Sequence, residues 1–89
     1  MQSKVTQAFW KCYAALPKHI KELAAYNYQN YFKHNPYHPS LQFKQLRGFE
    51  GVYSVRIGIG YRALGKYDKI TDCITWFWVG SHEDYNKIS

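Results

Sequence analysis

Two β-prone runs near the C-terminal end constrain the fold of this chain more than any other feature. In the first run, apolar side chains occupy alternate positions: Tyr53, Val55, Ile57 and Ile59. Period two predicts a strand with one buried face and one open face, and Arg56 falls on the open face. The second run, residues 74–79, is apolar and aromatic on both faces, which is typical of a central strand. Pairing of these strands would place Arg56 and Arg62 on the sheet and His82 at its rim.

Length and composition predict one folded domain spanning residues 1–89. The chain is 46% hydrophobic and 19% aromatic, which is enough for a single modest core. Twelve Lys and Arg residues against six Asp and Glu give a net charge of +6 and a pI near 9.4. Such charge slightly favours a polyanionic partner, either nucleic acid or an acidic protein segment, over ordinary solubilising charge.

The cysteines and the hydropathy predict a cytoplasmic protein without a membrane segment. Cys12 and Cys73 lack the spacing of a disulfide framework and are expected to be buried thiols. The N-terminus MQSKVTQ is polar, and no apolar run approaches the length of a membrane span.

Helical spacing of apolar residues dominates the first third of the chain. It predicts one helix from about Ser3 or Thr6 to Leu16 and a second over about Lys18–Lys33. Pro17 separates them, so we expect a helical hairpin laid on a sheet. A proline-punctuated loop, residues 34–40, then leads to a short strand at 41–46 and a turn at 47–51.

Glycine and histidine motifs are interpreted structurally. The spacing of Gly58, Gly60 and Gly65 does not suit a phosphate-binding loop, and we expect the first two to bend or bulge the strand around Ile59. The next strand is expected at 61–66, a turn at 67–69 and the last strand at 70–79. Loop histidines lack nearby Cys or carboxylate ligands, so neither a metal site nor a cofactor is predicted. The predicted fold is α+β: an N-terminal helical hairpin on one face of a small, mostly antiparallel sheet of about four strands.

This order of elements resembles the RelE/ParE superfamily of type II toxins. Five short segments carry the resemblance: Leu-Pro-Lys at 16–18, Phe-Lys-Gln-Leu-Arg-Gly at 43–48, Tyr-Ser-Val-Arg-Ile-Gly at 53–58, Tyr-Arg-Ala-Leu-Gly at 61–65 and Trp-Phe-Trp-Val-Gly-Ser-His at 76–82. RelE-like members cut mRNA in the ribosomal A site, whereas ParE-like members poison DNA gyrase and are not nucleases. Both kinds are held inactive by an antitoxin that wraps around them. The resemblance therefore implies a toxin, and the residues must indicate which kind.

Metal-free RNA cleavage needs a base for the 2′-hydroxyl, cations for the phosphorane and an acid for the leaving 5′-oxygen. Arg56 and Arg62 can supply the cations, since guanidinium matches phosphate oxygens. Arg62 also matches an arginine that faces the scissile phosphate in RelE-like nucleases. His82 can transfer the proton and matches a strand-end histidine of the superfamily. The alternatives are a capping or packing role for His82 and, for the arginines, surface salt bridges to Glu50, Asp68 or Asp72.

Three further residues complete the candidate site. Tyr85 would share a face with His82 if residues 81–87 form a helical turn, and could stack on a base, bind phosphate or simply plug the C-terminus. Lys44 matches a basic position on the first strand of RelE-like members, and Arg47 would add a contact to the RNA backbone. Glu83 and Asp84 could favour protonated His82 or weaken RNA binding there.

The sequence thus predicts a ribosome-dependent endoribonuclease (an mRNA interferase), with a ParE-like gyrase poison as the alternative. The catalytic residues would be His82, Arg62, Arg56 and Tyr85, and the RNA-binding residues Lys44 and Arg47. We expect an acidic, partly disordered antitoxin to bind this toxin in a hetero-oligomer.

Overall fold

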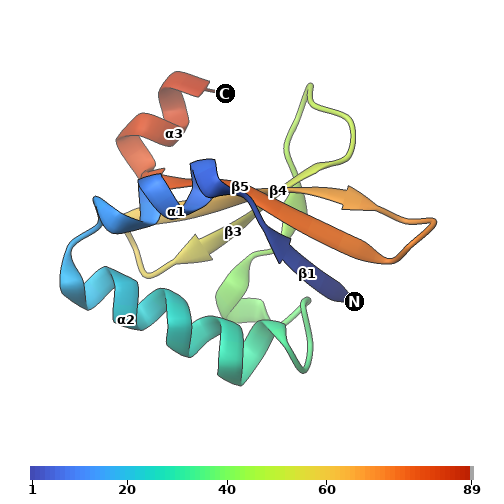
Figure 1. The fold of residues 1–89 in the computed structure, drawn as a ribbon, viewed down its shortest axis with the longest axis horizontal. Coiled ribbons are helices and arrows are strands. Elements are labelled where there is room, and N and C mark those ends of the chain that lie inside the picture. Colours follow the sequence, from blue (N-terminus) through green and yellow to red (C-terminus); the bar gives the residue numbers. More distant parts are fainter. Residues whose placement is uncertain (89) are drawn as a thin grey trace.

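A five-stranded sheet with a helical layer on one face forms the computed structural model, which describes residues 1–88 (Figure 1). The elements are β1 (Gln2–Val5), α1 (Gln7–Ala14), α2 (Lys18–Asn27), a π-helical turn η1 (Tyr28–Phe32), a 3-10 turn η2 (Pro39–Leu41), β2 (Lys44–Gln45), β3 (Val52–Ile57), β4 (Tyr61–Asp68), β5 (Cys73–Ser81) and α3 (His82–Ile88). The strand order is β1-β5-β4-β3-β2, and every pairing is antiparallel except that of β1 with β5. The predicted α+β fold is confirmed, with one strand more than the four expected.

The N-terminal residues join the sheet before the first helix begins. Thr6 caps α1, because its Oγ1 accepts a hydrogen bond from the Phe9 backbone N–H at 3.1 Å. Residues 2–5 pair in parallel with β5, from Gln2 opposite Cys73 to Val5 opposite Trp76. Of the two helix starts considered from the sequence, the one at Thr6 matches the structure.

The hydrophobic core lies between the helical layer and one face of the sheet. Its buried members are Leu16, Ile20, Phe32, Leu41, Val55, Ile57, Ala63, Ile74, Trp76 and Val79. The predicted alternation is therefore confirmed for Val55 and Ile57. It is wrong for Ile59, which is 90% exposed in the turn between β3 and β4. Gly58 adopts a φ of +62°, which reverses the chain there instead of bulging a continuing strand.

The second hairpin turn also differs from its prediction. β4 continues to Asp68, and Ile70 lies 93% exposed in the turn before β5 begins at Cys73. β5 in turn reaches Ser81, two residues beyond the predicted end at Val79. β4 is therefore longer than predicted at the end next to this turn, whereas β5 is shifted along the chain toward His82.

A β-bulge in β5 decides which aromatic residues face the core. Leu64 pairs with Trp78 whereas the next residue, Gly65, pairs with Trp76, so Phe77 is the extra residue. Trp76 therefore faces the helices, while Trp78 and Gly80 lie on the opposite side of the sheet. Figure 1 shows α3 and the loop between β2 and β3 on that side, away from α2. We call this side of the sheet the open face, although two of its side chains, Ser54 and Leu64, are buried. Its residues are Ser54, Arg56, Arg62, Leu64, Trp78 and Gly80.

The two cysteines differ in burial. Cys73 is buried as expected, whereas Cys12 is only half-buried, and both are free thiols. None of the helices in residues 1–88 is long and apolar enough to span a membrane.

Candidate functional site

Two arginines lie side by side on the open face. Arg56 in β3 pairs directly with Arg62 in β4, an arrangement of like charges that normally destabilises a sheet. Neither arginine forms a salt bridge with any residue in the range 1–88. One proposed acidic partner, Asp72, instead binds the N-terminal amino group at 3.3 Å and the Tyr67 hydroxyl at 2.8 Å. Two cations on paired strands, neither of them neutralised by an acidic side chain in residues 1–88, suit an anion with several oxygens, such as a phosphate.

The two guanidinium groups are held differently. Arg56 donates from Nε to the carbonyl oxygen of Gly58 at 2.7 Å, which anchors its side chain to the β3–β4 turn. In Arg62, Nε and Nη1 are buried and have no hydrogen-bond partner among the described residues. Its guanidinium carbon lies 5.2 Å from the centroid of the Tyr85 ring, within the range of a cation–π contact. Unpaired buried donors cost free energy, so their retention favours a role in binding an external acceptor.

The last strand and α3 bring His82 next to this pair. Ser81 Oγ accepts a hydrogen bond from the Asp84 N–H at 3.1 Å, which supports the first turn of α3. The expected helical turn after Ser81 is confirmed, and it stacks the rings of His82 and Tyr85 with centroids 5.9 Å apart and an interplanar angle of 24°. Tyr85 therefore touches both Arg62 and His82. The His82 backbone N–H also donates to the carbonyl of Gly60, which ties α3 to the β3–β4 turn.

The two remaining candidates lie at the edge of the sheet. Lys44 in β2 pairs with Ser54, and this register places it on the same face as Arg56, where it is exposed. Arg47 is exposed in the following turn. The structure thus gathers Arg56, Arg62, His82 and Tyr85 into one cluster and leaves Lys44 and Arg47 beyond β3. A phosphate chain crossing the open face could reach both groups.

Sequence reasoning gave no role on the open face to Trp78. The bulge at Phe77 turns its side chain to the open face, in the same row as Leu64. The only available signal was the Trp-x-Gly pattern, since a glycine two residues along a strand leaves room for a large ring on that face.

The clearest pKa shifts belong to the opposite end of β4. A hydrogen bond to the Asp72 carboxylate raises the pKa of Tyr67 to about 12. The same hydrogen bond, together with the N-terminal amino group, lowers the pKa of Asp72. The pair ties the turn before β5 to the start of β1. In residues 1–88, no three His, Cys, Asp or Glu side chains are placed to hold a metal ion together.

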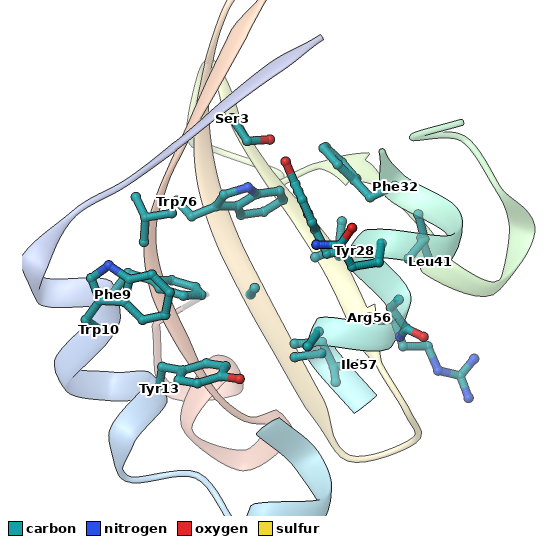
Figure 2. Close-up of a pocket in the computed structure, with 17 residues that line it drawn as sticks. Ser3, Phe9, Trp10, Tyr13, Tyr28, Phe32, Leu41, Arg56, Ile57 and Trp76 are labelled. Carbon is teal, nitrogen blue, oxygen red and sulfur yellow. The ribbon is translucent and has the colours of Figure 1, made fainter. Parts of the chain in front are cut away.

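The helical side of the sheet carries an apolar cleft. It measures about 330 Å³ and lies between α1, α2 and the sheet (Figure 2). Aromatic rings dominate its walls, and Trp10 at this cleft is 53% exposed. Arg56 contributes to the lining, but its guanidinium points away from the cleft in Figure 2. The cleft and the arginine pair therefore lie on different sides of the sheet.

Comparison with known proteins assigns the chain to a family. The ParE-like toxin domain family matches residues 18–87, and the chain belongs to it. It is a toxin of a toxin–antitoxin system in the RelE/ParE superfamily, as the resemblance implied. No curated protein matches its sequence.

Solved structures support the same fold at low sequence identity. A chain of the RelB–RelE antitoxin–toxin complex from Methanococcus jannaschii is 19% identical, with a TM-score of 0.76 over 96% of each chain. The toxin–antitoxin complex RelBE2 from Mycobacterium tuberculosis gives 22% identity and a TM-score of 0.71 over 91% of this chain and 96% of that one. A mutant of Escherichia coli RelE in the free state is 16% identical in sequence, with a TM-score of 0.69 over 96% of this chain and 86% of that one.

Proposed function

We propose that this toxin is an endoribonuclease that cleaves mRNA on the ribosome by attack of a 2′-hydroxyl. The main observation is that Nε and Nη1 of Arg62 are buried without a hydrogen-bond partner among residues 1–88, while the guanidinium lies against Tyr85 and the residue pairs with Arg56. A structural salt bridge would have used these cations. Their open arrangement instead suits the oxygens of a phosphodiester.

The chemistry follows from the position of each group. Arg56 and Arg62 bind the scissile phosphate and stabilise the extra negative charge that develops on the phosphorane. The 2′-hydroxyl gives its proton to a water molecule, and the 2′-oxygen forms a bond to phosphorus as the bond to the 5′-oxygen breaks, which leaves a 2′,3′-cyclic phosphate. His82, exposed at the rim beside Tyr85, donates a proton to the departing 5′-oxygen. Lys44 and Arg47 hold the neighbouring phosphates along the sheet edge.

Primer extension on an mRNA translated in a cell-free system tests this function. The wild-type protein should introduce cuts within A-site codons, and His82→Ala and Arg62→Ala should each lower the cutting by about 100-fold or more, as loss of a general acid or a charge-stabilising group does. Lys18→Ala is the control, because Lys18 is highly exposed on α2 and makes only a surface pair with Glu22 at 4.0 Å. Intact mRNA at protein concentrations that arrest growth would refute the proposal.

A second candidate function is a DNA gyrase poison without nuclease activity, which the match to the ParE-like family favours. The same basic face would then bind a protein or DNA surface without proton transfer. His82→Ala separates the two functions, because a poison should keep its toxicity and a nuclease should lose it. Gyrase-linked DNA breaks in cells with intact mRNA would favour the poison.

The partner of this toxin is expected to be an acidic, partly disordered antitoxin. Structural neighbours include toxin–antitoxin complexes. Residues 1–47 contain seven basic residues and one acidic residue, a net charge of +6 that equals that of the whole chain: Lys4, Lys11, Lys18, Lys21, Lys33, Lys44 and Arg47 against Glu22. An acidic segment with apolar side chains would match both this charge and the apolar cleft beside α1. The complex should weaken strongly between 0.1 and 1 M salt, about the range over which charges become screened.

A further inference from the structure

A second pocket lies where β5 passes beyond the end of β1. Pairing of β1 with β5 stops at Trp76, so the last part of β5 is not covered by that strand. A pocket of about 340 Å³ lies here, between the C-terminal end of α1 and the first turn of α3. Its lining includes Cys12, Tyr61, Trp78 and Asp84. The pocket therefore combines aromatic rings with a carboxylate, immediately beside the α3 turn that carries His82 and Tyr85.

The indole ring of Trp78 forms one wall of this pocket and lies close to Gly80. A Cβ atom added at Gly80 would lie 2.6 Å from Cζ2 and 2.9 Å from Cη2 of the Trp78 indole, so this ring covers Gly80 closely. Gly80 does not have a positive φ, so its backbone alone does not require glycine there. The absence of a side chain instead leaves room for the six-membered ring of the indole next to the Gly80 backbone. Because Gly80 pairs with Arg62, the ring covers the residue of β5 that lies opposite Arg62.

We propose that this pocket holds one base of the RNA whose phosphate is bound by Arg56 and Arg62, with Trp78 as the stacking surface and Asp84 as the group that reads the base edge. This inference rests on the proposed nuclease function and assigns it a base preference. A carboxylate only accepts hydrogen bonds, so it favours an edge with adjacent donors. Guanine offers such an edge with its N1–H and its amino group. The ligand class is therefore single-stranded RNA with a guanine next to the cleaved bond.

Sequencing of the cut sites measures the preference directly. Wild-type protein should favour guanine at one position beside the cut, and Asp84→Asn should reduce this preference by about tenfold, the order of a lost bidentate base contact. Trp78→Leu should weaken cleavage about tenfold through KM, whereas Trp78→Phe should keep most of it because a phenyl ring still stacks. Glu83→Gln is the matched control, since Glu83 is the adjacent carboxylate of α3 and does not line the pocket. An unchanged preference in Asp84→Asn and unchanged KM in Trp78→Leu would overturn the proposal.

A binding assay separates this inference from the nuclease function. Cys12 lines the pocket and is half-buried, whereas the other thiol, Cys73, is buried. A short 2′-O-methyl oligonucleotide cannot be cleaved, and one that contains guanine should slow alkylation of Cys12 by N-ethylmaleimide at least threefold. An oligonucleotide without guanine should slow it less, and Trp78→Leu should abolish the protection.

The two assays give distinct outcomes. Cleavage with an unchanged base preference in Asp84→Asn, and without protection of Cys12, would refute the pocket and leave the nuclease function standing. Guanine-dependent protection without any cleavage would support the pocket and refute the nuclease. Absence of both would refute both.

Discussion

Replacement of Arg62 by methionine should stabilise this protein while abolishing its toxicity. Methionine is long and unbranched, so it can follow the path of the arginine stem without introducing a charge or a donor. In the native protein, Nε and Nη1 of Arg62 are buried and have no hydrogen-bond partner in the described range 1–88. A residue that lowers the stability of the fold is retained where function requires it. Arg62→Met tests whether Arg62 is such a residue.

The expected magnitude follows from these contacts. Each unsatisfied buried donor costs about 1–3 kcal/mol, and the two nitrogens of one guanidinium share part of that cost. Loss of the contact with Tyr85 removes about 0.5–1 kcal/mol of cation–π attraction. The repulsion from Arg56 across the strand pair also disappears. The net gain is about 1 kcal/mol or more, which would raise the Tm of a domain this small by roughly 4–8 °C.

Thermal unfolding followed by circular dichroism measures this shift, and growth arrest after induced expression measures the toxicity. Lys66→Met is the matched control on the same strand, because Lys66 Nζ is partnered with the Glu50 carbonyl oxygen at 2.7 Å. That variant should lose a little stability and keep its toxicity. If Arg62→Met lowers the Tm as Lys66→Met does, then Arg62 serves the fold, and the argument from its unpaired donors is refuted.

Three further predictions concern the fold. Ile74→Ala should cost about 2–5 kcal/mol in urea unfolding, since Ile74 is 0% exposed, whereas the same change at Ile70 in the exposed turn should cost almost nothing. Thr6→Ala should remove the cap of α1 and lower the free energy of unfolding by about 1 kcal/mol. The raised pKa of Tyr67, about 12 against an ordinary 10.0, gives stability that is present below pH 10 and is lost as the pH rises toward 12. Tyr67→Phe should therefore show a smaller loss of stability in alkaline unfolding curves over that interval.

Local patterns in the sequence were sufficient for much of the architecture. Helical spacing and Pro17 predicted the helical hairpin, and alternation predicted the buried face of β3, because these periods follow from the geometry of one element and its burial. The three-residue spacing of His82 and Tyr85 likewise predicted a shared helical face, and the two rings stack. The residue types of the candidate site were visible for the same reason, since a charged side chain in an apolar strand is conspicuous without knowledge of its neighbours.

Long-range pairing decided the rest. Residues 2–5 are mostly polar and carry no strand signal of their own, so their place as β1 depends on an edge of β5 far along the chain. The positions of Ile59 and Ile70 in turns depended on where the paired strands end, which no single run of residues reveals. The side on which Trp78 emerges depended on the bulge at Phe77, a mismatch between two strands. The burial of Arg62 Nε and Nη1 without a hydrogen-bond partner in residues 1–88 likewise depended on how elements distant in the sequence pack around this side chain.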